Sequence, residues 1–322
     1  MTTKRIGFLM DPIESISFKK DSTLEMMWQA QQMGWQLEYF LQADCYVDNG
    51  APRARSKGIK VAMNSKKWFE FTHEDDIALG DLDVIMMRKD PPFDMEFVYT
   101  TYLLELAENL GSLIVNKPNA LRDCNEKMYT QWFPELTPKS LITRNEQDIR
   151  GFLKTHEDII VKPLDGMGGT SIFRLQKHDP NIGVVIETMT DYGKQFTLCQ
   201  KYVPEISQGD KRILMINGEP VDFCLARIPS QGETRGNLAA GGRGVSKPLS
   251  ERDREICKVV GPELVKRGII FAGLDVIGDY LTEINVTSPT CIRELNEQNN
   301  LNIAGILISA IEQALLIKSQ KS

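Results

Sequence analysis

The sequence has no run of about 18 consecutive apolar residues, the length that a membrane-spanning helix requires. Its most apolar stretch, residues 301–317, is interrupted by four polar side chains and therefore predicts a buried C-terminal helix. The apolar run that follows Arg5 ends at Asp11, which makes it too short for the core of a signal peptide. We therefore expect a cytoplasmic protein with no membrane partner.

Cysteine and histidine are both scarce, and neither forms a metal-binding or catalytic pattern. The 322 residues hold six cysteines and three histidines. The cysteines are far apart, with no C-x-x-C pair and no histidine at the spacing of a zinc site. No Ser-His-Asp arrangement is evident. We expect the cysteines to be reduced thiols, as is usual in the cytosol.

Basic residues are too few for a surface that binds nucleic acid or anionic lipid. Lys and Arg together number 38, Asp and Glu number 44, and the formal net charge is -6. With 42% hydrophobic and 25% charged residues, the composition is globular rather than disordered or collagen-like. We expect no nucleic-acid partner, although an acidic protein can still hold a local basic pocket.

Strand and helix patterns alternate in the first part of the chain, and the length suggests two or three domains. Strand patterns occur at residues 4–10, 35–40, 83–87 and 113–115, and helical patterns at 24–33 and 95–110. Such alternation favours a parallel sheet covered on both faces. The first unit, residues 1–122, is therefore predicted to be an α/β domain.

The rest of the chain divides into two further units. The unit at residues 123–203 begins with a predicted helix at 125–132 and continues with strands and helices around a glycine-rich turn. The unit at residues 204–322 is richer in strands, and Asn217-Gly218 between two of them is a strong hairpin signal. We expect an α+β arrangement in these two units.

The first candidate site is a lysine at the end of an apolar strand, followed by a glycine-rich turn. Residues 159–169 read I-I-V-K-P-L-D-G-M-G-G, and Lys162 ends the strand. Glycines let backbone N–H groups approach an anion closely, so the turn is a candidate phosphate-binding loop. The pattern is neither a Walker P-loop nor a Rossmann fingerprint. A plain hairpin turn without a ligand is the alternative.

The second candidate site is a set of oxygen donors in residues 274–285, L-D-V-I-G-D-Y-L-T-E-I-N. Asp275 lies in an otherwise apolar strand, and Glu283 and Asn285 share one face of the next strand. A buried carboxylate is costly unless it is paired or bound to a metal. Two carboxylates and an amide suit Mg²⁺, while two solvent-facing acids on an edge strand are the alternative.

A shared metal site in this hairpin depends on its register. A two-residue turn at Gly278-Asp279 would pair Asp275 with Thr282 and point Glu283 to the opposite face. A three-residue turn, or an equivalent bulge, would pair Asp275 with Glu283. The metal hypothesis therefore predicts an odd-length turn or a bulge.

The third candidate is a long loop at residues 229–245, which contains five glycines together with Arg235 and Arg243. Connections of this length are usually functional lids or disordered linkers, and the arginines favour a lid. Arg212, on a predicted strand beside a phosphate site, becomes a candidate to stabilise a transferring phosphoryl group. Together these features indicate ATP-dependent chemistry, and no protein-kinase motif is present.

These residues resemble the ATP-grasp superfamily and, within it, the family of bacterial glutathione synthetases, over nearly the whole chain. The resemblance is carried by M-D-P at 10–12, M-R-K-D-P-P at 87–92, V-N-K-P at 115–118, R-D-C-N-E-K at 122–127, residues 162–169, A-R-I-P at 226–229, the loop at 232–244 and L-T-E-I-N-V-T-S-P-T-C-I-R-E at 281–294. It implies an N-terminal parallel-sheet domain, residues 1–122, followed by an ATP-grasp fold of two subdomains, residues 123–203 and 204–322.

The resemblance also implies a reaction. ATP phosphorylates the C-terminal carboxylate of γ-glutamylcysteine, and the amine of glycine attacks the acyl phosphate. Glutathione, ADP and phosphate are the products. The family further implies two Mg²⁺ ions, with Mn²⁺ as a substitute, and a homotetramer.

The roles of individual residues follow from the same resemblance. The residues implied for ATP are Lys127, Lys162, Gly166, Gly168, Gly169, Gln200, Lys201, Tyr202 and Val203. Those implied for the metal are Asp275, Glu283 and Asn285. Those implied for catalysis are Arg212 and Arg235, and those for the dipeptide and its ligation are Asp11, Arg88, Arg227, Arg235, Ser288, Pro289 and Thr290.

Two alternatives remain at this point. One is another ATP-grasp carboxylate–amine ligase with a different amino acid or peptide substrate. The other is a nucleotide-binding regulatory protein without turnover. The presence of Arg212, Asp275, Glu283 and an arginine-bearing loop favours catalysis over binding alone.

Overall fold

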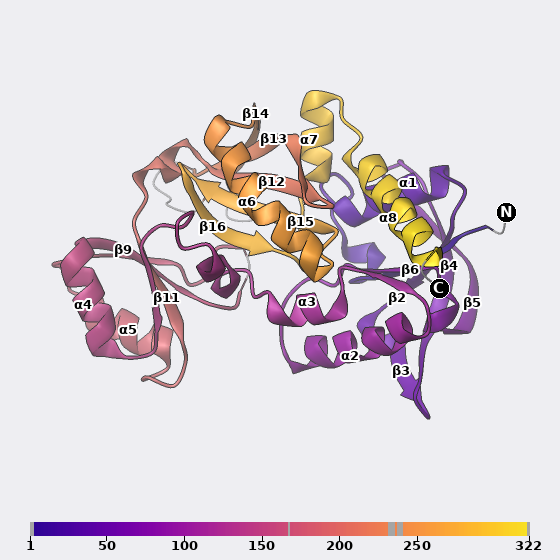
Figure 1. Ribbon diagram of the computed structural model, residues 1–322, viewed down its shortest axis with the longest axis horizontal. Coiled ribbons are helices and arrows are strands. Elements are labelled where there is room, and N and C mark those ends of the chain that lie inside the picture. Colours follow the sequence, from indigo (N-terminus) through magenta and orange to yellow (C-terminus); the bar gives the residue numbers. More distant parts are fainter. Residues whose placement is uncertain (1–2, 167, 231–235, 237–240, 321–322) are drawn as a thin grey trace.

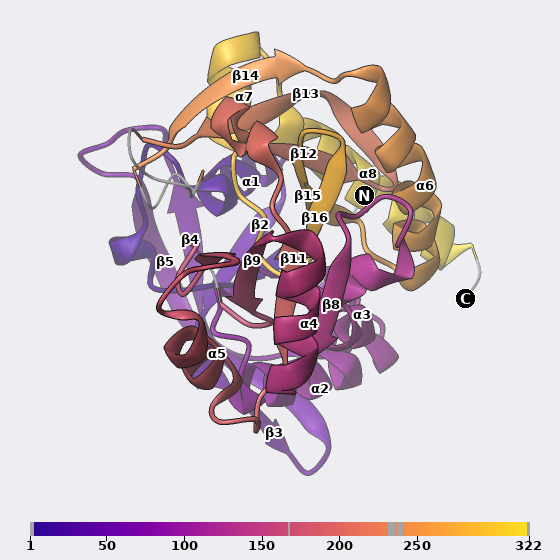
Figure 2. The same ribbon diagram turned by 90° about the vertical axis from the view of Figure 1, so that its left-hand side faces the viewer.

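The structure, a computed structural model, describes residues 3–166, 168–230, 236 and 241–320. Within these residues the chain forms three sheets that follow one another along an elongated molecule (Figure 1). The sheet formed by residues 140–201, central in the sequence, lies at one end of the molecule, and in Figure 2 this end faces the viewer. The predicted α/β fold with α+β character in its second part is confirmed.

The N-terminal sheet has seven strands. They are β1 (Arg5–Leu9), β2 (Gln36–Phe40), β3 (Cys45–Asp48), β4 (Ala51–Val61), β5 (Phe69–Ala78), β6 (Val84–Met87) and β7 (Leu113–Val115). Its helices are η1 (Ile13–Ser15), α1 (Ser22–Gln32), η2 (Gln42–Asp44), η3 (Leu79–Asp81), α2 (Met95–Asn109) and α3 (Pro118–Asp123).

The strand order β2-β1-β6-β7 is parallel throughout, as predicted. The prediction of a purely parallel sheet is nevertheless incomplete, because β3, β4 and β5 add an antiparallel extension beyond β2. The parallel part is buried on both faces. On β1, Ile6 and Phe8 belong to the core beneath α1 and the C-terminal helix α8 (Ile303–Ser319), while Leu9 belongs to the core beneath α2.

The caps of the first helices follow the expected chemistry. The carboxylate of Asp21 accepts a hydrogen bond from the backbone N–H of Leu24 and so begins α1. Gly34 follows the end of this helix with a positive φ of 80°, which glycine adopts readily. Asp94 caps α2 in the same way through the N–H of Phe97.

The central sheet is antiparallel, in the order β10-β9-β11-β8. Its elements are η4 (Met128–Trp132), β8 (Ser140–Thr143), α4 (Glu146–His156), β9 (Asp158–Pro163), β10 (Phe173–Gln176), α5 (Ile182–Thr190) and β11 (Thr197–Lys201). The prediction of a helix at 125–132 is wrong in type and start. Asn125 instead forms a turn, in which its side chain accepts from the N–H groups of Lys127 and Met128, and only a 3₁₀ helix follows.

The C-terminal sheet is also antiparallel, in the order β14-β13-β12-β15-β16. Its elements are η5 (Pro204–Gln208), β12 (Asp210–Ile216), β13 (Glu219–Ile228), β14 (Arg243–Pro248), α6 (Glu251–Arg267), β15 (Phe271–Ile277), β16 (Tyr280–Asn285), α7 (Ile292–Asn299) and α8 (Ile303–Ser319). The last helix returns to pack on α1, so the end of the chain stabilises its beginning (Figure 1).

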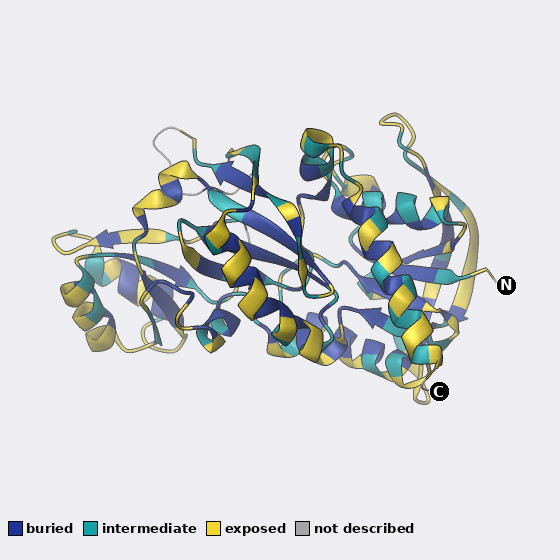
Figure 3. Cartoon of the chain, turned by 45° about the horizontal axis from the view of Figure 1, so that its top comes forward, coloured by how far each residue is buried: buried dark blue, intermediate teal, exposed yellow. Residues whose placement is uncertain are grey.

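The inner strands of the sheets are buried, whereas the edge strands β3, β5 and β10 and the outer faces of the helices are largely exposed (Figure 3). All six cysteines are free thiols, and five of them are buried. Among the described residues no single helix is long and apolar enough to cross a membrane. Only α7 and α8 taken together pass that test, and they are bent by 119° at the break between them.

Candidate active site

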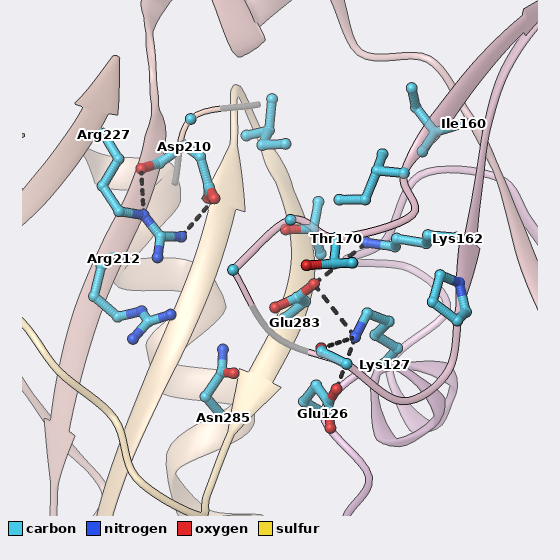
Figure 4. A pocket seen from close by; sticks show the side chains of 18 of the residues that line it. Glu126, Lys127, Ile160, Lys162, Thr170, Asp210, Arg212, Arg227, Glu283 and Asn285 are labelled. Carbon is cyan, nitrogen blue, oxygen red and sulfur yellow. Dashed lines mark hydrogen bonds and ion pairs between the residues drawn. The ribbon is translucent and has the colours of Figure 1, made fainter. Parts of the chain in front are cut away.

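A cavity of about 360 Å³ lies between the central and C-terminal sheets. Its lining comes from strand ends and turns that are far apart in the sequence. On one side are the end of β9, the turn after it and the end of β11. On the other are β12, β13, β16 and residues 287–291. Figure 4 shows side chains from both sides pointing toward this space.

Two lysines enter the cavity around one carboxylate. The Nζ atom of Lys162 lies 3.6 Å from Oε1 of Glu283, and that of Lys127 lies 3.9 Å from the same oxygen. Lys127 also pairs with Glu126 at 2.7 Å. Burial lowers the pKa of Lys162, and Glu283 opposes this only in part. Burial acts in the same direction on Lys127, but Glu283 and Glu126 outweigh it and raise its pKa.

The glycine-rich turn connects β9 to β10 and also lines the cavity, so it is both a hairpin turn and part of the candidate site. Gly166, Gly168 and Gly169 have positive φ angles of 111°, 69° and 79°, a region that other residues rarely adopt. Lys127 holds the turn by donating to the carbonyls of Leu164 and Gly166, at 3.3 and 3.2 Å.

The end of β11 supplies a further wall of the cavity. Gln200, Lys201, Tyr202 and Val203, for which the family resemblance implies ATP binding, all line it. Gln200 is buried, and its Nε2 has no hydrogen-bond partner among the described residues. A buried donor without a partner favours binding of a ligand that carries an acceptor.

Opposite this wall lies a buried cluster of arginines and carboxylates. Asp275 accepts hydrogen bonds from Nε and Nη2 of Arg212, the latter at 3.0 Å, and forms an ion pair with Nη2 of Arg227 at 2.8 Å. Burial alone would raise the pKa of Asp275, but the two guanidinium groups hold it well below its usual range. Arg227 also pairs with Asp210 (Figure 4).

The predicted metal ligands lie together at the β15–β16 hairpin. The turn has two residues, and a bulge between Asp275 and Val276 restores the pairing of Asp275 with Glu283, so the prediction of an odd-length turn or a bulge is confirmed. Glu283 and Asn285 line the cavity. Asp275 lies behind them and is 2% exposed. Asn285 donates through Nδ2 to Asp275 at 3.3 Å, which leaves its carbonyl oxygen for the cavity.

This donor set suits a hard divalent cation. Such ions accept carboxylate and amide oxygens and complete their shell with water and phosphate oxygens. The described residues contain no group of three or more His, Cys, Asp or Glu side chains arranged for a metal. The candidate set is therefore two carboxylates and one amide, of which Glu283 and Asn285 face the cavity directly.

The residues predicted for the dipeptide form two groups. Ser288, Pro289, Thr290 and Arg227 line the cavity, whereas Asp11 and Arg88 do not. The buried Arg88 lies next to this segment, because its Nη2 donates to the carbonyl of Pro289 at 3.0 Å. Asp11 pairs with Lys89 at 2.9 Å and accepts from the N–H of Asp90, which does line the cavity.

Part of the predicted lid lies outside the described residues, and Arg235 is in that part. The predicted end of the loop is wrong, because Arg243 already begins β14 and pairs with Ile228. Gly236 lines the cavity and approaches β13 closely. A Cβ atom at this position would lie 2.4 Å from the carbonyl oxygen of Arg227.

Two acidic residues that line the cavity, Asp210 and Glu126, were not predicted from the sequence. Asp210 lines the cavity beside Arg227, and burial raises its pKa to about 6. Asp210 and Arg212 are two residues apart on β12 and therefore share a face, which was a usable signal. Glu126 precedes Lys127 and forms an ion pair with it. No local sequence pattern predicts that Glu126 lines the cavity.

Comparisons with known proteins agree with this geometry. The chain matches the model of the prokaryotic glutathione synthetase N-terminal domain over residues 5–122 and that of the prokaryotic glutathione synthetase ATP-grasp domain over residues 126–300. It is 57% identical over 311 residues to the glutathione synthetase of Escherichia coli O6:H1, covering 97% of this chain and 98% of the relative. The glutathione synthetase of Photorhabdus laumondii is 56% identical over 312 residues, covering 97% and 99%.

Solved structures with a similar fold are far more distant in sequence. D-cycloserine synthetase DcsG superimposes with a TM-score of 0.68 at 12% identity, covering 96% of this chain and 99% of that one. D-alanine–D-alanine ligase from Bacillus anthracis, complexed with ATP, gives a TM-score of 0.58 at 12% identity, covering 100% of both. At this identity the likeness concerns the fold alone.

Proposed function

Because this chain belongs to the prokaryotic glutathione synthetase family and is an ADP-forming, ATP-dependent ligase that makes glutathione, we propose that its cavity joins γ-glutamylcysteine to glycine through an acyl phosphate. A carboxylate oxygen of the dipeptide attacks the γ-phosphorus of ATP, and ADP leaves. The glycine nitrogen then attacks the acyl carbon, phosphate leaves with the bonding electrons, and the ammonium protons are released. One cavity lined by Lys127, Lys162, Arg212 and Arg227 carries this proposal.

ATP binds between the two sheets in this proposal. Gln200, Lys201, Tyr202 and Val203 contact the base, and the turn with Gly166, Gly168 and Gly169 lies over the phosphates. Lys127 and Lys162 balance the phosphate charge, which in their low-dielectric surroundings is a strong interaction. Arg212 faces the phosphoryl group in transit, and Asp275 fixes the orientation of its guanidinium through two hydrogen bonds.

In this proposal Asp275, Glu283 and Asn285 would hold Mg²⁺, or Mn²⁺ in its place, with Glu283 and Asn285 facing the cavity. When bound, the metal would neutralise phosphate charge and favour departure of ADP. Glu283 lies within ion-pair distance of both lysines. Metal and nucleotide should therefore bind together, because phosphates that pair with the ammonium groups would leave the carboxylate of Glu283 available to a cation.

The dipeptide lies near the N-terminal sheet. Arg88 and Arg227 supply positive charge for its carboxylates, with Asp11 and Arg235 as further contacts, and residues 288–290 close the place of ligation. Because the acyl phosphate hydrolyses readily, the proposed role of the loop that contains Arg235 is to exclude water from the site. The division into residues 1–122, 123–203 and 204–322 and the homotetramer remain part of the proposal.

An assay of the purified protein tests this function. ADP and phosphate should be released in equal amounts with glutathione, only when ATP, Mg²⁺, γ-glutamylcysteine and glycine are all present. Product formation with another amine or another acid in preference would favour a different carboxylate–amine ligase. Nucleotide binding without turnover under these conditions would contradict the proposal.

A further inference from the structure

Asn116, the residue that follows β7, makes an unusually complete set of hydrogen bonds. Its side chain is buried, with 3% exposure. Nδ2 donates to the carbonyls of Phe271 and Val286, each at 2.7 Å. Oδ1 accepts from the backbone N–H groups of Ile270 and Phe271, each at 2.9 Å. An amide side chain has two N–H donors and two acceptor sites, so its capacity is fully used.

All four partners are backbone groups at one end of the hairpin that carries the proposed metal ligands. Phe271 begins β15, which continues to Asp275, and Val286 directly follows Asn285 at the end of β16. The neighbouring Lys117 adds a backbone hydrogen bond to the carbonyl of Gly268 at 3.3 Å. Asn116 therefore connects the N-terminal sheet to the β15–β16 hairpin.

The same sheet edge carries Arg88. Strands β6 and β7 are parallel and in register, with Met86 opposite Val115, so Arg88 and Asn116 both follow the ends of these strands. Arg88 donates to the carbonyl of Pro289 at 3.0 Å, three residues beyond Val286. Two side chains from one rigid edge thus hold residues 286–289, at Val286 through Asn116 and at Pro289 through Arg88.

We propose that Asn116 is a positioning residue for ligation. It fixes the position of the dipeptide-binding residues relative to the β15–β16 hairpin and the nucleotide. This inference rests on the proposed function. The acceptor carboxylate and the γ-phosphorus approach from different sheets, and a misplacement of about 1 Å can cost about 100-fold in rate. In the proposed function the nucleotide is contacted mainly by Lys127, Lys162 and residues 200–203, and none of these is a hydrogen-bond partner of Asn116.

The test uses Asn116→Asp in the full-length protein. The substitution keeps the shape but loses both N–H donors and directs a carboxylate oxygen at the carbonyls of Phe271 and Val286. We expect kcat for glutathione to fall about 100-fold, with the Kd for the ATP analogue AMPPNP within about threefold of the parent. The amount of ADP formed per glutathione should rise above one, because the acyl phosphate is hydrolysed before the amine reaches it. That ratio does not depend on the fraction of folded enzyme.

Ser112→Ala is the matched control. Ser112 is fully buried and its Oγ donates to the carbonyls of Leu79 and Leu82, each at 2.7 Å, in connections that flank β6 and β7 of the N-terminal sheet. It should lose stability while keeping an ADP-to-glutathione ratio of one. If Asn116→Asp does not fold, Asn116→Ser, which retains one donor and one acceptor, decides the question. A ratio of one with unchanged kcat in the folded variant overturns the inference, whereas failure of the parent to make glutathione would overturn the proposed function instead.

Discussion

Arg212 and Asp275 are directly opposite each other on the antiparallel strands β12 and β15, and their side chains form a bidentate ion pair. Arg227, from the next strand, adds a third donor to the same carboxylate at 2.8 Å. All three side chains are buried. Asp275 therefore compensates two guanidinium groups within the protein, in addition to its proposed part in binding a metal.

The first prediction is that Asp275→Asn is strongly destabilising. Removing one partner of a buried ion pair leaves uncompensated charge and typically costs about 3 to 5 kcal/mol. Urea unfolding should show this loss, and glutathione synthesis should be abolished. The control is Asp158→Asn, which removes the partly exposed pair with Arg174 and should cost no more than about 1 kcal/mol. Equal losses of unfolding free energy in the two variants would mean that the buried ion-pair cluster stabilises the fold no more than an exposed ion pair does.

The second prediction concerns Lys162, which is only 6% exposed. Burial lowers its pKa, so the charged form is not favoured by folding. Lys162→Met should keep the melting temperature within a few degrees of the parent or raise it. Turnover should fall at least about 100-fold, because the ammonium group acts on transition-state charge. Lys177→Met, which breaks the exposed pair with Glu157, should leave the melting temperature and the turnover unchanged. A stable Lys162→Met enzyme with normal turnover would remove this lysine from the site.

The third prediction is a pair of pH dependences with opposite sign. Burial raises the pKa of Asp210 to about 6, so the folded state binds more protons than the unfolded state between about pH 4 and pH 6. The parent should lose stability relative to Asp210→Asn as pH rises through this window. Hydrogen bonds from Arg174 lower the pKa of Asp158. The ionised Asp158 therefore stabilises the folded state above about pH 4, and this stabilisation is lost as pH falls.

Urea unfolding at a series of pH values measures both difference curves. Relative to Asp158→Asn, the parent should gain stability as pH rises in the acid range. Relative to Asp210→Asn, it should lose stability over pH 4 to 6. Parallel curves would contradict the assignment of opposite electrostatic environments to these two carboxylates.

The hairpin shows how far local sequence determines the site. Alternation on β16 placed Glu283 and Asn285 on one face, and the need for Asp275 on that face predicted a bulge or an odd turn. Which of the two occurs depends on a side-chain contact within the folded hairpin and on pairing with a neighbouring strand. Thr282, the extra residue of the bulge, donates through Oγ1 to the carbonyl of Asp275 at 3.1 Å, and β12 fixes the register of β15 through Arg212.

The antiparallel extension of the N-terminal sheet was missed because β5 is an edge strand with mostly exposed side chains, four of which are acidic. Its stability comes from pairing with β4, for example between Arg53 and Asp76 at 3.0 Å, which a pattern within one segment does not reveal. Asn116 was noticed only as part of a motif. Its partners lie more than 150 residues away along the chain, so no local signal could assign its role.

The last prediction concerns the proposed homotetramer. Helix α2 and its C-cap carry an exposed apolar stripe of five residues that are 37–61% exposed, Met95, Tyr99, Tyr102, Leu106 and Leu110. Contiguous apolar surface of this kind is uncommon on a monomer and supports burial against another copy of the chain.

A charge in this stripe should weaken association, because it would be buried without a partner. Leu106→Arg should therefore reduce the mass measured by light scattering from that of a tetramer to that of a dimer or monomer, with an unchanged circular dichroism spectrum. Val259→Arg, which places the same charge at a similarly exposed apolar position on α6, is the control and should remain tetrameric. A tetrameric Leu106→Arg protein would place the interface elsewhere, and a monomeric parent would contradict the homotetramer itself.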